Sequence, residues 1–472
     1  MEVAQNSYIK ENKSLFKKLV DTLLKDYEYV SLLAQNGEGK VYSVSKSGVR
    51  IDANNRILVQ RGFVVKVYDA GCFAEYSGND ISDTKIDEIV KTIKDDLLKL
   101  GEGNAKSSYI IPEDEPVSFS KSTEYQIDPA ELGDEAIISR LKGLFDKGMG
   151  FDEKILNFAV SCNYQKYSKL FLSRNRDMEQ NVMWATGMVC AYSLKGEEVK
   201  TAYRPCSVLG GMELLDRLDS KVFDSCKVAI ELIDSEPLAP GEYECICSPE
   251  TTGMIVHEAF GHGVEMDMFV KDRALAAKYV GEYVASPLIT MHDGNAVNDT
   301  ATYFFDDEGT MSKDTIIIDK GILVTGISDL QSAGALGTEP TGNGRRQDFE
   351  RKAYTRMTNT YFEAGNDKLE DMIASVKDGL LLEDPSSGME DPKNWGIQCM
   401  VNIAREIKDG KLTGRIFSPI ILTGYVPDLL KSISMVSDKK ELCGSGFCGK
   451  GYKEWVKVSD GGPYIKARIR LG

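Results

Sequence analysis

Short runs of β-branched and aromatic residues, bounded by turns that contain Gly, Asn or Asp, recur in both halves of the chain. Two of these runs double back at Asp-Lys-Gly and Lys-Asp-Gly, within residues 315–328 and 401–417. Such tripeptides between apolar runs are typical of β-hairpins. Strands that follow one another with few crossover helices predict an α+β fold with mostly antiparallel sheet, rather than a doubly wound parallel sheet.

Apolar residues recur every three or four positions in a few segments, which predicts amphipathic helices there. Ser82 and Asp134 stand where N-caps are expected. The helices expected span residues 6–26, 82–100, 134–145, 212–233 and 367–377. Strands are expected across residues 29–77 and 151–208, where the pattern changes to short β-rich runs.

A domain boundary is predicted near residue 235. The segment SEPLAPGEYE, residues 235–244, contains two prolines and a glycine. A chain of 472 residues is long enough for two or three domains at roughly 150 residues each. We therefore expect an α+β domain over residues 1–235 and a β-rich domain over residues 236–472.

The net charge of the chain argues against nucleic acid as a binding partner. Lys and Arg number 57 and Asp and Glu number 73, giving a formal charge of −16, which disfavours direct contact with nucleic-acid phosphates.

No apolar run approaches ~18 residues, so no membrane span is expected. The polar N-terminus, MEVAQNSYIKENKS, has no apolar core of a signal peptide, which predicts a cytoplasmic protein. The ten cysteines of the chain include no CxxC pair, and most of them are expected to be reduced.

The segment that indicates chemistry is GMIVHEAFGHGVEMD, residues 253–267, which holds two of only three histidines. His257 and His262 are candidate metal ligands, and Glu258 beside the first can accept a proton from water. On a regular α-helix a spacing of five places the two imidazoles about 140° apart, too far for one ion. The helix should therefore widen into a π-like turn or unwind before His262, with Gly261 tolerating the irregular backbone.

A catalytic zinc ion has three protein ligands and one open position, so a third ligand must come from elsewhere. His292 is one candidate, although the Asp-Gly after it predicts a surface turn. Acidic candidates are Asp306, Asp307 and Glu308 in FFDDEGT. The thiol candidate is Cys448 in GSGFCGKG, where flanking glycines allow close approach and Lys450 would favour the thiolate.

Five segments in order resemble the TldD/PmbA peptidase family: VHEAFGHGVEMD, DDEGT, PTGNGRRQ, RMTNTY and CGKG. The similarity runs from about the RGFVVKVYDAG segment to Lys450, and the intact His-Glu-x-x-x-His motif is similar to the metal-bearing, TldD-like branch. After Lys450 the chain departs from the family pattern, reading GYKEWVKVSDGGPYIKARIRLG.

The resemblance implies one zinc ion per active chain, held in the C-terminal domain by His257, His262 and Cys448, with Glu258 as catalytic base. It also implies short or unfolded peptides bound in extended form, by a homodimer or a heterodimer with a PmbA-like chain.

The polar motifs PTGNGRR and RMTNTY offer possible substrate contacts. Arg345 and Arg346 could hold a peptide carboxylate, and Asn359 and Thr360 could bond to a peptide backbone. A structural turn explains these residues equally well.

Two other functions are compatible with the sequence. His-Glu-x-x-Gly-His also resembles the motif of dipeptidyl peptidase III, whose third ligand is a glutamate in a second acidic motif. The older family label suggests a regulatory protein that binds gyrase or DNA, which the net charge of −16 disfavours.

Overall fold

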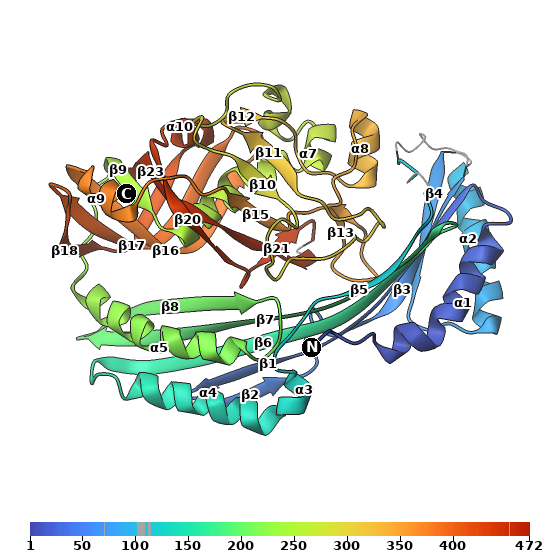
Figure 1. Cartoon of the computed structure of the whole chain (residues 1–472), viewed down its shortest axis with the longest axis horizontal. Helices are drawn as coiled ribbons and strands as arrows, with labels where there is room; N and C mark the ends of the chain where they lie inside the picture. Colours follow the sequence, from blue (N-terminus) through green and yellow to red (C-terminus); the bar gives the residue numbers. More distant parts are fainter. Residues whose placement is uncertain (70, 102–108, 112–114, 453) are drawn as a thin grey trace.

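Two large sheets dominate the molecule. The computed structural model describes residues 1–69, 71–101, 109–111, 115–452 and 454–472. The first sheet runs along the lower part of Figure 1 and curves upward at one end, and the second half of the chain lies above it. The fold is therefore a mixture of helices and extensive sheet, as the α+β prediction requires.

Within the described residues, eight strands form the first sheet in the order β4-β3-β1-β6-β7-β5, with β2 beside β1 and β8 beside β7. All neighbours are antiparallel except β5 and β7. The strands are β1 (Tyr29–Ser45), β2 (Gly48–Asp52), β3 (Gln60–Asp69), β4 (Cys72–Gly78), β5 (Val117–Ser122), β6 (Ile155–Leu172), β7 (Arg176–Lys195) and β8 (Glu198–Val208).

Helices cover the two ends of this sheet. One apolar cluster joins α1 and α2 to β1, β3 and β6, and a second joins α4 and α5 to β1, β6, β7 and β8. The helices are α1 (Ser7–Leu23), α2 (Asp83–Gly101), α3 (Pro129–Leu132), α4 (Asp134–Met149) and α5 (Leu214–Glu231). Four of them confirm helices predicted from apolar periodicity. No helix in the described part of the chain is long and apolar enough to cross a membrane.

The second sheet contains eleven strands among the described residues, and part of it closes on itself. In that part each of β9, β16, β17, β19 and β23 pairs with the next, and β23 pairs back with β9. The strands are β9 (Gly241–Cys247), β10 (Met291–Asp293), β11 (Thr315–Asp319), β12 (Ile322–Leu323), β15 (Asn359–Phe362), β16 (Asp378–Asp391), β17 (Gly396–Lys408), β18 (Lys411–Phe417), β19 (Ile420–Tyr425), β20 (Met435–Cys443) and β23 (Ser459–Leu471).

Both predicted hairpins are confirmed. The β11–β12 turn has Lys320 and Gly321 at φ 46° and 87°, and the β17–β18 turn has Asp409 and Gly410 at φ 47° and 74°. Two successive residues with positive φ are what a two-residue hairpin turn of type I′ requires.

Short elements complete the second half of the chain. Two small hairpins are β13 (Gly344–Arg345) with β14 (Tyr354–Thr355), and β21 (Phe447–Lys450) with β22 (Glu454–Lys457). The helices are α6 (Pro249–Met254), α7 (Met266–Val270), α8 (Leu330–Leu336), α9 (Leu369–Ala374) and α10 (Val426–Lys431). The helix predicted over residues 367–377 is thus confirmed as the shorter α9.

A buried ion network joins the first sheet to loop residues of the second half of the chain. Lys66 on β3 lies 3.0 Å from a carboxylate oxygen of Glu308 and 3.3 Å from one of Glu75. Arg346 approaches Glu75 at 3.1 Å. Lys66 and Glu308 are both almost fully buried, so neither charge has water to replace its partner.

We expect Lys66→Met to lower the free energy of unfolding by about 3–5 kcal/mol, because it leaves Glu308 buried without its cation. Urea denaturation followed by circular dichroism measures this. The matched control is Lys18→Met, which breaks an exposed pair with Asp83 and should cost under about 1 kcal/mol. Equal losses in the two variants would contradict the prediction.

Candidate metal centre

The helix that carries His257 widens where the five-residue spacing demands it. Ser248 caps α6 and Pro249 occupies its first turn, after which residues Ile255–Gly261 form a π-helix. The backbone N–H of His262 donates to the carbonyl of His257, five residues earlier. This hydrogen bond confirms the predicted π-like turn, which brings the two histidines round to the same side.

Gly261 is needed for a different reason from the one predicted. Its backbone is ordinary right-handed helix, with φ −59° and ψ −48°. A Cβ atom at this position would overlap the sulfur of Met357. Close packing, rather than backbone freedom, therefore explains the glycine.

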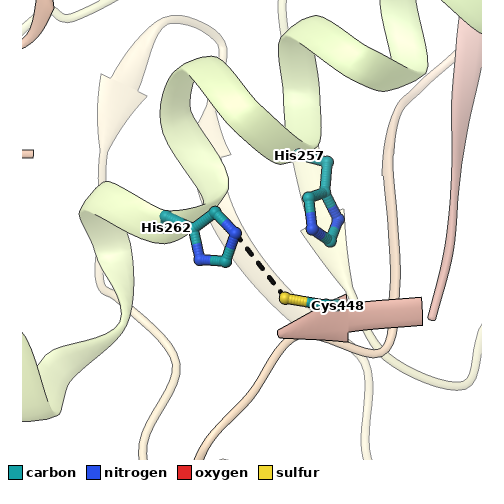
Figure 2. Close-up of side chains that lie close together, drawn as sticks. All are labelled: His257, His262 and Cys448. Atoms are coloured by element: carbon teal, nitrogen blue, oxygen red, sulfur yellow. Dashed lines mark hydrogen bonds between the residues drawn. The ribbon is translucent and has the colours of Figure 1, made fainter. Parts of the chain in front are cut away.

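Three side chains converge beside the π-helix. His257 and His262 have ring centroids 5.1 Å apart with planes at 89°, and Cys448 Sγ on β21 lies 3.6 Å from Nε2 of His262. One ligand atom from each of the three lies within 4.8 Å of the others (Figure 2). Zinc ligands in a tetrahedron lie about 3.4–3.8 Å apart, so these donors fit one such ion with little side-chain movement.

The electrostatics of the three groups also suit a cation. Burial alone would raise the pKa of the Cys448 thiol, but the two imidazoles hold it well below its usual range. Burial would lower the pKa of His262, yet Cys448 and Glu265 raise it well above the ordinary value. Nδ1 of His257 is buried without a hydrogen-bond partner in the described structure. A thiolate between two imidazoles is a donor set that zinc favours.

A second layer of contacts fixes His262. Its Nδ1 lies 3.2 Å from Glu265 Oε2, which leaves Nε2 facing Cys448. Burial would raise the pKa of Glu265, but Lys450 and His262 lower it to about 2. A carboxylate behind a ligand histidine sets its tautomer and orientation. Glu265 was missed in the sequence, although its spacing of three from His262 is a usable signal.

Lys450 does not act on Cys448 as predicted. Its ammonium lies 3.1 Å from Glu265 and 2.7 Å from Asp267, and the lowered pKa of Cys448 comes from the histidines. The lysine side chain points to the helix side of the cluster because two buried carboxylates need its charge there.

Arg356 holds the hairpin that carries Cys448. It is fully buried and donates to the backbone carbonyls of Cys448 and Glu454. These bonds fix β21 and β22 against the rest of the second half. The RMTNTY motif thus contributes to the site through its arginine, which the sequence analysis did not single out.

Glu258 opens onto a cavity of about 460 Å³ between the two halves of the chain. His257 and Asp460 of the second half also line it, together with Thr186 and Tyr203 of the first sheet. The cavity is large enough for several residues of a peptide.

The other predicted ligand candidates lie outside this cluster. Asp306 accepts from backbone N–H groups, Asp307 pairs with Lys169, and Glu308 pairs with Lys66. Among the described residues, the group able to hold a metal contains no glutamate. The geometry therefore favours the thiol candidate over the glutamate that a dipeptidyl-peptidase-III-like site requires.

His292 is not the surface residue expected from the Asp-Gly after it. It lies in β10, 5% exposed, with its ring stacked on Tyr361 at 5.2 Å, and Nδ1 is 2.7 Å from Asp314. Since β10 runs between β11 and β15, the sheet buries a segment that local turn chemistry placed at the surface.

The side chains of Arg345 and Arg346 make hydrogen bonds and an ion pair within the protein. Arg345 donates to the carbonyls of Met357 at 2.6 Å and Lys457 at 2.7 Å, and buried Arg346 pairs with Glu75. Neither lines the cavity of Glu258, so we leave both out of the proposed substrate site.

Asn359 and Thr360 are fully buried on β15. Asn359 donates to the carbonyl of Gly294 at 2.9 Å, and Thr360 donates to Asp293 at 2.6 Å. Their hydrogen bonds hold β15 to the last residue of β10 and to the loop that follows it. They are likewise left out of the proposed substrate site.

Several known proteins are similar to this chain in sequence. Residues 240–469 match the family model described as the PmbA/TldA metallopeptidase C-terminal domain. The chain is 24% identical to a metalloprotease of Methanocaldococcus jannaschii, over 95% of this chain and 97% of that one. It is 29% identical to a metalloprotease of Methanothermobacter thermautotrophicus, over 59% of this chain and 61% of that one.

A shorter match has higher identity. The metalloprotease TldD homolog of Haemophilus influenzae is 37% identical over 45% of this chain and 44% of its own length. Several relatives are thus matched over less than two thirds of their length.

Solved structures share the fold. TldE from Thermococcus kodakarensis superposes with a TM-score of 0.76 at 17% identity, over 97% of this chain and 100% of that one. A Thermotoga maritima protein described as a modulator of a DNA gyrase gives 0.79 at 14% identity, over 98% and 100%. These structures, at 14–17% identity, show the shared fold. The match of residues 240–469 to the C-terminal domain model, together with the TldD relatives, places that part of the chain in the TldD/PmbA metallopeptidase family.

Proposed function

We propose that the protein is a zinc-dependent peptidase in which His257, His262 and Cys448 hold one zinc ion and Glu258 is the general base. The observation that carries this proposal is the convergence of three ligand atoms within 4.8 Å, next to a carboxylate that opens onto a cavity. When bound, zinc supplies Lewis acidity, which lowers the pKa of water and polarises a carbonyl.

The chain's own residues would carry the proton. Glu258 follows His257 directly in the π-helix, so its carboxylate lies beside the ligand cluster and faces the cavity. It accepts the proton of the attacking water and returns it to the leaving amine. Gly388 allows this placement, since a Cβ atom there would lie 2.6 Å from Cγ of Glu258.

We propose extended peptides, short or unfolded, as substrates. Strand β16 pairs with β17 along Asp378–Asp391, but β9 covers its other edge only at Gly379–Leu382. The remaining edge reaches Gly388 beside Glu258. A peptide strand added to such an edge is held by its backbone, which gives low sequence selectivity.

We propose that residues 236–472 form the metallopeptidase domain and that residues 1–235 form a domain that completes the cavity. The family model covers residues 240–469, and the cavity is lined by strands of both sheets. Assembly as a homodimer, or as a heterodimer with a PmbA-like chain, is part of this proposal.

Metal analysis tests the ligand assignment. We expect His257→Ala and Cys448→Ala to lose bound zinc, because two remaining ligands rarely hold a catalytic ion. The matched control is Cys72→Ala, which removes a half-buried thiol on β4 and should keep stoichiometric zinc. A double variant, Cys448→Ala with His262→Ala, that still held one zinc ion per chain would contradict the assignment.

Glu258→Gln separates chemistry from binding. The change is nearly isosteric and removes only the group that accepts the proton, so zinc content should stay at the parent level. Peptide cleavage should fall by about 10²–10⁴-fold. Cleavage of unfolded peptides is measured before and after zinc is removed with a chelator, and again after zinc is added back. Each measurement is made on the chain alone and on the chain mixed with any copurifying partner. Cleavage at the parent rate would show that Glu258 is not the base.

The binding-protein alternative is tested beside it. If the parent chain cleaves no peptide in any combination yet binds DNA in a salt-dependent manner, the peptidase proposal is wrong and the regulatory one is favoured.

A further inference from the structure

A second cavity lies between the two halves of the chain and has no part in the proposed reaction. It is about 70 Å³ in volume and is walled by the first sheet on one side and by the β21–β22 hairpin on the other. Gly446 lines the cavity of Glu258, whereas the next residue, Phe447, lines this one. The two cavities are therefore neighbours with different walls.

Cations dominate its lining. Four cationic side chains and one carboxylate face it, in a chain whose formal charge is −16. The charged residues are Lys169, Arg345, Arg346, Lys457 and Asp307. Asp307 pairs with Lys169 and also lies near Arg346. Among the described residues, Arg345 and Lys457 have no ion-pair partner in the lining. A local excess of positive charge inside an acidic protein needs a physical reason.

Lys457 is the least compensated of these groups. It is 7% exposed, and its Nζ donates to the carbonyl of Gly446 at 3.0 Å. Among the described residues, no carboxylate lies within 4.0 Å of that ammonium, which instead lies 4.8 Å from the ring centroid of Trp184 and 4.5 Å from that of Phe447. Burial lowers the pKa of Lys457 to about 7. A buried ammonium without an anion is costly.

The neighbouring arginine also has a donor to spare. Arg346 binds Glu75 and the carbonyl of Arg351 through its terminal nitrogens. Its Nε is buried and has no partner in the described structure. The lining residues therefore include an unpartnered N–H donor and a lysine that makes no ion pair, and a bound anion would interact favourably with both.

We propose that this cavity is a binding site for a small oxyanion, either inorganic phosphate or a carboxylate group. One water needs about 10–15 Å³ of such volume, so about 70 Å³ admits a group of this size and excludes a nucleotide. The anion would lie against the ammonium of Lys457, in a cavity that Trp184 and Trp455 also line.

The site adjoins the metal centre through the hairpin. Lys457 on β22 pairs with Phe447 on β21, one residue before Cys448. The anion site lies outside the proposed catalytic machinery, because neither Glu258 nor a proposed ligand lines it. The proposal therefore stands or falls independently of peptidase activity.

Tryptophan fluorescence is a direct probe, because two of the chain's three tryptophans line the cavity. Zinc-loaded full-length protein is titrated with inorganic phosphate or with acetate, against chloride at equal ionic strength. We expect a saturable fluorescence change and a Tm raised by a few degrees. Tighter binding of phosphate than of acetate would identify inorganic phosphate as the ligand class. Tighter binding of acetate would identify a carboxylate group. No saturable response to either anion, relative to chloride, would overturn the proposal.

Two substitutions of Lys457 test whether the anion that changes the fluorescence binds in this cavity. Lys457→Met keeps the apolar stem but removes the charge, and should weaken anion binding at least tenfold. Lys457→Gln, which keeps a donor for Gly446, serves if the first variant does not fold. The matched control is Lys466→Met, a buried lysine on β23 that binds Ser375 and Glu244, and it should respond as the parent does. An unchanged response in both Lys457 variants would show that the anion binds elsewhere.

Discussion

The five-residue spacing between His257 and His262 is the constraint on which the site depends. A regular helix would place these imidazoles about 140° apart, and the π-helix over Ile255–Gly261 removes that offset. Widening a helix costs stability, so the surroundings must favour it. Met357 packs so closely on Gly261 that even a methyl group would not fit, and the segment around the π-helix is buried in the largest apolar cluster.

Cys448, the third side chain of the cluster, lies near the C-terminal end of the sequence and is held in place by a separate set of contacts. Cys448 sits on a two-stranded hairpin too short to be stable alone. Arg356 binds the hairpin from one side, while Lys450 ties it to Glu265 behind His262. The same lysine and carboxylate thus connect the hairpin to the π-helix, which makes the convergence of the three ligand atoms a property of the packed second half.

Local signals predicted local structure well. Apolar periodicity located α1, α2, α4 and α5, turn chemistry located both hairpins, and helix geometry predicted the π-like turn before His262. Long-range pairing was out of reach: the tail that departs from the family pattern forms β23, which pairs with four other strands. His292 was misplaced for the same reason, because its burial depends on β11 and β15, which lie far along the chain. Arg356 matters through backbone partners about 90 residues away, which no spacing reveals, whereas Glu265 could have been found from its spacing of three from His262.

The first sheet contributes to the site through a strained bend in β16. Asp384 has φ 58°, a conformation that costs a non-glycine residue about 1–3 kcal/mol. Arg204 on β8 pairs with Asp384, and Tyr203 donates to the carbonyl of Pro385. The pairing of β16 with β17 shifts register just beyond, before the strand reaches Gly388 and Glu258. The contacts from β8 offset the strain and set where the edge of β16 runs. Although each proposed ligand and the proposed base lie in the second half, the shape of the cavity they face is therefore fixed from the first.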